Sequence, residues 1–439
     1  MPGFPSVAVA ARIIEVRGDP MNYLLARIVA VFCATALTAA AADWPQFRGP
    51  ERSAISQETG LLRSWPANGP KMLWRADGLG QGYGTVAVVG DRAYVVANRG
   101  MGSEYVTALS VADGSQIWST EMGPVGKPDQ QPPYPSARST PTVVGDVLYA
   151  LSSNGDLVSI QTATGEILWR KSLLEDFAGQ SGKWAYAESP LIDGEVLIVA
   201  PGGAEATMVA LNRETGATIW KSAIPGGEPA GFASAIPTEA AGRKQYVQFL
   251  DKGIVGVDAK TGEFLWRYGG TASGPANIPT VVVEGDLVYT SNARRFGGAL
   301  VRISNEAAGT KAEEVYFSRT APNTLGGQVL VDGILYGTNQ DGLTAARFES
   351  GELLWQSEGG PGSVQYADGH LYVHWESSEV SLVEATPEAF REKGRFTPPN
   401  PPGAANGLPK VTWTYPVAAN GRLYIRDLGT LWCYDISAQ

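Results

Sequence analysis

Apolar residues recur along the chain in short runs rich in β-branched side chains, and Gly-containing dipeptides separate the runs. Within Ser139–Trp169, the runs cover Thr142–Val144, Val147–Leu151, Leu157–Gln161 and Glu166–Trp169. The joining dipeptides are Gly-Asp, Asn-Gly and Thr-Gly, which favour the left-handed backbone conformations of tight hairpins. Four short antiparallel strands followed by a longer connection are typical of one blade of a β-propeller.

The same unit is repeated along the chain. Complete copies end at Trp118, Trp169, Trp220, Trp266 and Trp355, and drifted copies end at Phe317 and near Phe396. The final copy stops before its fourth strand, whereas Gly69–Trp74 reads as a fourth strand without the first three. Pairing these two pieces would close the ring and remove its open edges. The sequence therefore predicts an all-β, eight-bladed propeller of four-stranded antiparallel blades, with seven blades as the alternative if a drifted copy is misread.

An aromatic residue ends the outer strand of each complete copy. A large ring at this place can pack against the neighbouring blade and bury its apolar surface there. We therefore predict a structural docking role for the tryptophans Trp74, Trp118, Trp169, Trp220, Trp266 and Trp355, with Phe317 in the corresponding place of its copy.

Composition is consistent with this fold, and the net charge argues against a nucleic-acid partner. The 439 residues include 53 Gly and 29 Pro, and only 18% of them are charged, which suits a turn-rich β protein. The formal net charge is −10. A nucleic-acid surface needs a basic stripe that neutralises phosphates, so we expect no nucleic-acid partner.

The N-terminal part has the pattern of an export signal. From Met21, Arg27 precedes an apolar run, Ile28–Leu37, and small residues lead to Ala42. We interpret residues 21–42 as a signal peptide cleaved near Ala42, and residues 1–20 as a start-site misassignment. The apolar run is short for a bilayer span, so an uncleaved anchor is the weaker alternative and no transmembrane segment is expected after cleavage. The mature protein would then be periplasmic or secreted.

Cleavage would also remove one of the two cysteines. Cys33 lies inside the signal, so the mature chain keeps only Cys433 and can form no internal disulfide. The lead that follows the signal, residues 43–70, carries the aromatic residues Trp44, Phe47 and Trp65. We expect this lead to pack across the propeller formed by residues 71–439.

Two copies of the repeat resemble a known family closely. The segments "ALNRETGATIW" (Ala210–Trp220) and "GVDAKTGEFLW" (Gly256–Trp266) are similar to the tryptophan-docking repeat of pyrroloquinoline-quinone-like propellers, which include the outer-membrane protein assembly propellers. The resemblance implies the propeller fold over the whole mature domain. It leaves the function open, because some members bind the quinone and calcium as dehydrogenases, whereas others have no cofactor and serve as binding scaffolds.

Topology indicates where a site would lie. The Gly-Asp and Thr-Gly turns must share one face of the ring, and the long links between blades must lie on the opposite, long-loop face. We expect side chains that enter the innermost strands, or that lie in these long loops, to line a central funnel. The candidate ligand-binding residues are Arg138, Trp184, Tyr186, Glu188, Asn277, Arg294, Arg295, Tyr366 and Trp413.

Candidate chemistry is sparse. A calcium-bound quinone needs oxygen ligands, an arginine, an aromatic floor and a carboxylate base. Glu188, Asn277, Arg138 and Trp184 could supply parts of this set, but no Asp stands clearly at a funnel entrance. The only histidines, His370 and His374, are four residues apart on a predicted strand and too distant to chelate one metal alone.

The sequence therefore favours an exported, non-catalytic propeller that binds a protein or a small ligand through its funnel and long loops. We predict no catalytic residue, metal or cofactor. The alternative is a quinone- and calcium-dependent dehydrogenase that oxidises alcohols or sugars. A third possibility, a sugar-binding or sugar-processing protein, has only the aromatic-rich loops in its support.

Overall fold

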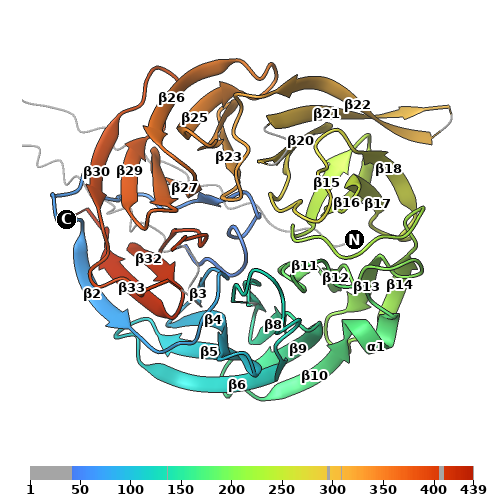
Figure 1. Ribbon diagram of the computed structural model, residues 1–439, viewed down its shortest axis with the longest axis horizontal. Coiled ribbons are helices and arrows are strands. Elements are labelled where there is room, and N and C mark those ends of the chain that lie inside the picture. The colour runs from blue at the N-terminus through green and yellow to red at the C-terminus, as the bar shows by residue number, and fades with distance from the viewer. Residues whose placement is uncertain (1–41, 136, 294–296, 308, 405–409, 439) are drawn as a thin grey trace, which may run out of the picture. The chain divides into compact units, whose positions relative to one another are not determined.

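The computed structural model describes residues 42–135, 137–293, 297–307, 309–404 and 410–438. The predicted start-site misassignment, the signal peptide up to Ala41 and the pair Arg294–Arg295 lie outside the described residues. The described chain forms eight sheets arranged around a ring (Figure 1). The eight-bladed prediction is confirmed, and the seven-bladed alternative is wrong.

The first four blades follow one another along the chain. Blade 1 comprises β3 (Ala87–Val89), β4 (Arg92–Arg99), β5 (Ser103–Ser110) and β6 (Gln116–Pro124). Blade 2 comprises β7 (Thr142–Val144), β8 (Val147–Leu151), β9 (Asp156–Gln161) and β10 (Ile167–Ser172). Blade 3 comprises β11 (Leu191–Asp193), β12 (Val196–Val199), β13 (Met208–Asn212) and β14 (Thr218–Ser222). Blade 4 comprises β15 (Ile236–Ala240), β16 (Arg243–Leu250), β17 (Gly253–Asp258) and β18 (Phe264–Tyr268).

The next three blades continue the pattern. Blade 5 comprises β19 (Val282–Glu284), β20 (Leu287–Asn292), β21 (Gly297–Glu306) and β22 (Gly309–Ser318). Blade 6 comprises β23 (Gln328–Val331), β24 (Ile334–Thr338), β25 (Gly342–Arg347) and β26 (Leu353–Gly359). Blade 7 comprises β27 (Gly362–Ala367), β28 (His370–Trp375), β29 (Val380–Glu384) and β30 (Glu392–Phe396), and β1 (Ile55–Ser56) adds to it in parallel with β27. The short helix α1 (Leu173–Phe177) lies in the link between blades 2 and 3 and was not expected from the sequence.

Blade 8 is assembled from both ends of the described chain. It contains β31 (Val417–Ala419), β32 (Arg422–Asp427), β33 (Thr430–Asp435) and the N-terminal strand β2 (Lys71–Ala76). β2 is antiparallel to β33, with Trp74 opposite Cys433. The ring is thus closed by hydrogen bonds rather than by a covalent link, and Cys433 is buried and free. Among the described residues, no helix is long and apolar enough to cross a membrane.

The apolar core is divided among the interfaces between neighbouring blades. One cluster joins Trp74 and Tyr424 of blade 8 to Val88 and Leu109 of blade 1. Corresponding clusters lie at the other interfaces around the ring. Each blade therefore buries its two faces against its neighbours, and burial of apolar area is the main stabilising contribution of such contacts.

The repeat tryptophans connect one blade to the next. The indole N–H of Trp118 donates to the Thr162 carbonyl of blade 2 at 2.9 Å. Its ring covers Gly165, where an added Cβ would lie 2.7 Å from the ring, and Gly165 has a φ of 79°. The same contact joins Trp74 to Gly114, Trp169 to Gly216 and Trp220 to Gly262. Trp355 donates to the Thr386 carbonyl at 2.8 Å, whereas Trp266 donates to Gln245 of its own blade.

In blade 5, one of the drifted copies, the docking residue differs from the one predicted. Tyr316, not Phe317, takes the docking position of blade 5, because the register pairs Tyr316 with Leu300 as it pairs Trp220 with Ala210. The Tyr316 hydroxyl donates to the Phe348 carbonyl at 2.8 Å and the ring covers Gly351. The assignment of Phe317 is therefore wrong.

Blade 7 has no docking residue of its own. The corresponding register position in β30 is Gly394, opposite Leu382. An added Cβ there would lie 2.6 Å from the Cβ of Trp65, and the Trp65 ring lies 5.8 Å from that of Tyr372. Tyr–Trp pairs of similar separation occur in other blades, such as Tyr336 with Trp355. Trp65 of the N-terminal lead thus fills the place of the absent tryptophan.

The beginning of the lead runs into the centre of the ring. Trp44 bridges to Val88 of blade 1, and the Pro45 carbonyl accepts from Val143 of blade 2. Ile55 pairs with Tyr366 of blade 7. A segment that reaches innermost strands in so many blades must lie at the axis, and its trace crosses the middle of the ring in Figure 1. We call residues 44–56 the axial plug.

Two buried arginines fix the axial plug to the blades. Arg52 donates to the carbonyls of Ser189 and Pro190 before β11 and of Ala235 before β15. Arg48 donates to the Gln328 carbonyl of blade 6 at 2.5 Å. Both have positive φ values, 61° and 52° for Arg48 and Arg52, so hydrogen bonds to several blades offset an unfavourable backbone conformation.

Gly165→Ala is expected to destabilise the protein more than Gly145→Ala. Both glycines have positive φ, so each substitution should cost about 1–2 kcal/mol for the left-handed backbone. Only at Gly165 does the Cβ also meet a tryptophan ring, which should add about 1–3 kcal/mol, because nothing lies within 4 Å of a Cβ at Gly145. Urea unfolding of both variants measures the difference. Equal losses would contradict the docking role of Trp118.

Arg52→Met is expected to lower the free energy of unfolding by about 2–4 kcal/mol, because it leaves buried carbonyls of blades 3 and 4 without their donor. Arg63→Met, at an exposed position of the same lead, is the control and should change it by less than about 0.5 kcal/mol. Thermal or urea unfolding distinguishes the two. An unaltered stability of Arg52→Met would show that the axial plug does not hold the ring together.

Candidate functional site

A cavity of about 380 Å³ opens at the centre of the long-loop face. Its lining comes mostly from the segments that precede the innermost strands of blades 1 to 6 and 8, together with Phe47 of the axial plug and with Asn292 and Ala293 at the end of β20. We call it the central cup. The axial plug reaches the axis on the turn side of these residues, because its ends pair with Val88 and with the C-terminal half of β27. The channel is therefore closed, and the cup is open on one face only.

Aromatic rings form two walls of the central cup. On one side Trp413 lies 4.8 Å from Tyr83 and 5.1 Å from Tyr134. On the other side Trp184 lies 5.7 Å from Phe232. Below them, Phe47 makes an edge contact with Tyr415 at 5.5 Å. An apolar cavity of this size with a few convergent polar groups is the usual form of a small-ligand site.

A belt of hydroxyl groups runs around the central cup. Thr85, Thr140, Ser189, Ser234 and Thr280 each lie two residues before the innermost strand of blades 1 to 5, and all line the cup. Each hydroxyl oxygen accepts a backbone N–H from the preceding blade: Tyr415 to Thr85 at 3.3 Å, Thr85 to Thr140 at 3.0 Å, Thr140 to Ser189 at 2.9 Å, Ser189 to Ser234 at 2.9 Å and Ser234 to Thr280 at 3.3 Å. These hydrogen bonds link blades 8, 1, 2, 3, 4 and 5 in succession, and they fix the orientation of the hydroxyl side chains.

Arg138 supplies the positive charge of the central cup. Its guanidinium donates to the Trp184 carbonyl at 2.5 Å and so connects blade 2 to the loop of blade 3. Burial lowers the pKa of Arg138 to about 10, and the neighbouring Tyr83 and Glu104 act in the opposite direction. The side chain therefore remains protonated at neutral pH.

Buried carboxyl groups support the central cup from behind. Glu188 accepts from the Ala200 N–H at 2.5 Å, and burial raises its pKa to about 7, opposed by the charge of Arg52. Glu104 accepts from the Ser153 N–H at 2.9 Å, and burial raises its pKa to about 7 as well. Both are fully enclosed, so they act as structural hydrogen-bond acceptors rather than as groups that meet a ligand.

The sequence-predicted residues are distributed over several environments. Arg138, Trp184 and Trp413 line the central cup together. Tyr186 is buried between blades 2 and 3, and its hydroxyl donates to the Pro201 carbonyl at 2.8 Å. Tyr366 pairs with the axial plug toward the turn face. Glu188 lies behind the lining, and Arg294 and Arg295 are outside the described residues.

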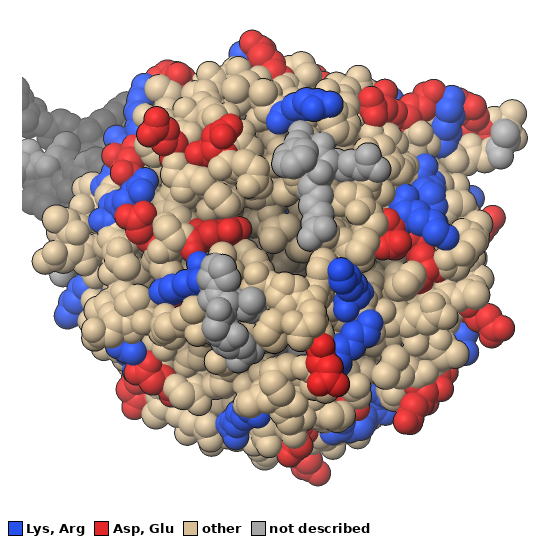
Figure 2. Space-filling view, viewed as in Figure 1, with Lys and Arg blue, Asp and Glu red and all other residues tan. Residues whose placement is uncertain are grey.

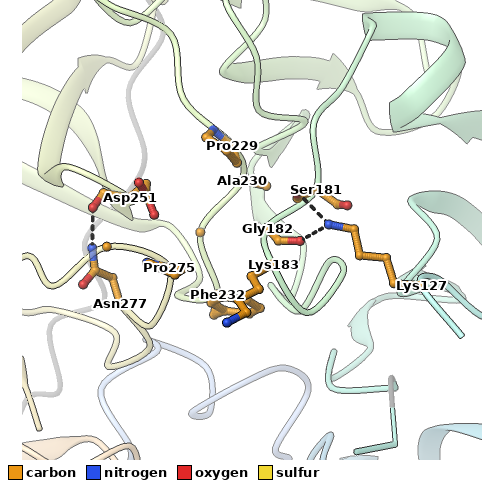
Figure 3. A pocket seen from close by; sticks show the side chains of 12 residues that line it. Lys127, Ser181, Gly182, Lys183, Pro229, Ala230, Phe232, Asp251, Pro275 and Asn277 are labelled. Atoms are coloured by element: carbon orange, nitrogen blue, oxygen red, sulfur yellow. Dashed lines mark hydrogen bonds between the residues drawn. The ribbon is translucent and has the colours of Figure 1, made fainter. Parts of the chain in front are cut away.

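Asn277 lies in a second depression, which we call the side groove. Its side-chain amide donates to the carbonyls of Leu250 and Asp251 at 2.7 and 3.0 Å. Asn277 therefore fixes the position of the turn between β16 and β17. The side groove has a volume of about 390 Å³, and Figure 3 shows Lys127, Gly182, Pro229 and Pro275 around it. Phe232 lines both the side groove and the central cup, so the two adjoin.

Several lining residues were missed in the sequence. Tyr83 lies four residues before the innermost strand of blade 1, as Arg138 lies four residues before that of blade 2. The hydroxyl belt had a usable signal, since Thr or Ser stands two residues before the first strand of five successive copies. Phe232 stands at the same offset before β15, so the repeat marks it as well. Tyr134 and Phe47 lie in irregular segments, and no repeat pattern marks them.

The eight blades and their repeated tryptophan contacts define a propeller built from pyrroloquinoline-quinone-like repeats. A family model described as outer membrane protein assembly factor BamB matches residues 45–124 and 102–357. The chain belongs to this family.

Curated relatives share part of this sequence, and solved structures share the fold. The assembly factor BamB of Burkholderia pseudomallei is 28% identical over 199 residues, which is 44% of each chain, and that of Kangiella koreensis is 26% identical over 234 residues, 53% of each chain. These matches span about half of each relative's length. The crystal structure of BamB from Moraxella catarrhalis has a TM-score of 0.56 at 17% identity and covers 84% of this chain and all of that one. A quinohemoprotein alcohol dehydrogenase from Pseudomonas putida has a TM-score of 0.50 at 11% identity, covering 91% and 81%. Both structural similarities concern the fold alone.

The central cup does not suit a calcium-bound quinone with a carboxylate base. None of its described lining residues is Asp or Glu. Behind the lining, Glu376 accepts from the Trp413 indole N–H at 3.1 Å, and Glu188 is bound to Ala200. In the part of the chain that the structure describes, no three His, Cys, Asp or Glu side chains are grouped to hold a metal. Calcium requires oxygen ligands such as carboxylates, and quinone-dependent oxidation of an alcohol requires a base.

The stability of the protein is expected to fall as the pH rises from 5 to 8. The pKa values of Glu104 and Glu188 are raised from their ordinary 4.5 to about 7, so folding favours the neutral carboxyl groups. Their contribution is complete below pH 4.5 and is lost as the pH rises through about 7. Urea unfolding at each pH measures this loss.

Glu188→Gln should make the loss smaller, because the amide keeps an acceptor for Ala200 without a charge. Glu205→Gln, at an exposed position, is the control and should leave the pH dependence unchanged. An unfolding free energy that increases from pH 5 to 8 would show that these carboxyl groups are not buried as described.

Proposed function

We propose that this protein is an exported, non-catalytic binding scaffold of the bacterial envelope, whose long-loop face receives a protein partner through the central cup. The observation that carries the proposal is the cup itself: a one-sided cavity with aromatic walls, fixed hydroxyls and Arg138, but with no carboxylate in its described lining. Such a lining can bind and orient a partner group. It offers no base for proton abstraction.

Family membership supports the partner class. The relatives are named as outer membrane protein assembly factors, and the signal-like segment before Ala42 is compatible with work outside the cytoplasm. The side groove adjoins the central cup, and its lining includes Gly182, Gly231 and Gly274. Glycines leave backbone groups accessible, so an extended partner segment could continue from the cup along this groove.

Surface charge supports a protein rather than a nucleic acid. Acidic and basic side chains are interspersed over the face seen in Figure 2, and no large patch of one sign is in view. The formal net charge is −10. Phosphate backbones require a continuous positive surface.

Site-specific photo-crosslinking in the native envelope tests the proposal. A photoreactive residue at exposed Lys183, beside the side groove, is expected to give discrete protein adducts, whereas one at exposed Glu214 in a turn of the opposite face should not. Ala293→Trp, which fills the central cup, should abolish the adducts, because the partner group can no longer enter.

Ala217→Trp, at an exposed turn-face position, is the matched control and should leave the adducts unchanged. Adducts that form equally at both faces, or that persist when the cup is filled, would refute the proposed docking face. Calcium-dependent oxidation of alcohols after addition of pyrroloquinoline quinone would refute the non-catalytic role.

A further inference from the structure

The hydroxyl groups of the belt accept hydrogen bonds from the described part of the protein but donate none to it. A serine or threonine hydroxyl can donate one hydrogen and accept through its oxygen. In the belt, the oxygens of Thr85, Thr140, Ser189, Ser234 and Thr280 all accept a backbone N–H. Within the described residues, none of the five donates its hydrogen to a protein acceptor within hydrogen-bond distance. The belt therefore presents hydrogen-bond donors.

These donors converge on one cavity. All five side chains line the central cup, and all five are almost fully buried, with exposed fractions between 1% for Thr140 and 4% for Ser234. A neighbouring hydroxyl group outside the cup behaves differently, because Thr142 donates to the Pro190 carbonyl at 2.6 Å. Thr142 thus uses a nearby carbonyl acceptor, whereas the hydroxyls of the belt line the cup instead.

The charge in the central cup also favours a negatively charged ligand group. Arg138 contributes a guanidinium, and no Asp or Glu is found in the described lining. Donor groups and a cation without a competing carboxylate favour a ligand oxyanion, since hydrogen bonds to a charged acceptor are about twice as strong as neutral ones. The aromatic walls around Trp413 and Trp184 favour an apolar or flat body beside that oxyanion.

We propose that the central cup binds an oxyanion carried on an aromatic or apolar body, with the hydroxyl belt and Arg138 as donors. This proposal rests on the cup being the binding site of the protein. Two sources share the chemistry: a free organic acid, or an acidic side chain beside an apolar one on the protein partner.

A pair of matched probes tests the oxyanion. Calorimetric titration of the mature chain with 2-naphthoate and with its neutral counterpart 2-naphthamide compares the same body with and without the charge. The acid is expected to bind at least about tenfold more tightly. Acetate, which has no aromatic body, should bind more weakly than 2-naphthoate. Equal affinities of the acid and the amide, or no binding of either, would overturn the proposal.

A pair of matched variants tests the belt. Ser234→Asn and Ser234→Asp have side chains of the same shape, and both keep an acceptor for the Ser189 N–H. Only the amide also keeps donors. Ser234→Asn should keep the affinity for 2-naphthoate. Ser234→Asp should weaken the binding of 2-naphthoate by about tenfold or more and leave the binding of 2-naphthamide nearly unchanged. Thr142→Val, which removes a hydroxyl outside the cup, should leave binding of 2-naphthoate unaltered.

A peptide pair distinguishes the two sources. A capped peptide with Phe-Glu at its centre and its Phe-Gln counterpart present the same chemistry on a chain. Tighter binding of the Phe-Glu peptide assigns the oxyanion to a protein partner, and binding of 2-naphthoate alone assigns it to a free acid. Photo-crosslinking at Lys183 is independent of the oxyanion, so adducts without any preference for acid over amide would refute this inference and leave the docking face intact.

Discussion

The structure depends on the burial of each blade against its neighbours, which is possible only if the ring is closed. Every apolar cluster of the core joins two adjacent blades, so an open ring would expose two whole blade faces to water. The pairing of β2 with β33 prevents this, because it lets Trp74 of the N-terminal strand dock on Gly114 of blade 1. Since Cys433 is free, no disulfide supports the closure. At most of the other interfaces, a tryptophan of the outer strand likewise lies over a glycine of the next blade.

The N-terminal lead completes the ring at two further places. Trp65 supplies the ring that blade 7 lacks at Gly394, and Glu58 accepts from the N–H groups of Asn420 and Gly421 in blade 8. The axial plug closes the channel and contributes Phe47 to the central cup. The same segment thus stabilises the scaffold and shapes the site.

The repeat made the fold predictable, whereas the site was predictable only in part. The Thr-Gly turn and the tryptophan that follows recur often enough to give eight blades and the split closure, because both features are fixed by local backbone conformation and by the next blade. Phe317 was misassigned because blade 5 has a long β21–β22 hairpin in place of the Thr-Gly turn that locates the docking residue in the other copies. Arg138, Trp184 and Trp413 were identified from the topology of the long links. Glu188 and Tyr186, in the same link, are instead turned into the interface, since side-chain direction in irregular segments follows from packing that one sequence does not reveal.

If the cup on the long-loop face is the binding site, a crystal structure with a bromine-labelled acid should show the acid there. Crystals of the mature chain soaked in 6-bromo-2-naphthoate would reveal the bromine by its anomalous scattering. We expect a bromine position between the Tyr83–Trp413 and Trp184–Phe232 walls, with the carboxylate at the hydroxyl belt and Arg138. A bromine site on the turn face, or an aromatic ring in the cup with its carboxylate directed to solvent, would contradict it.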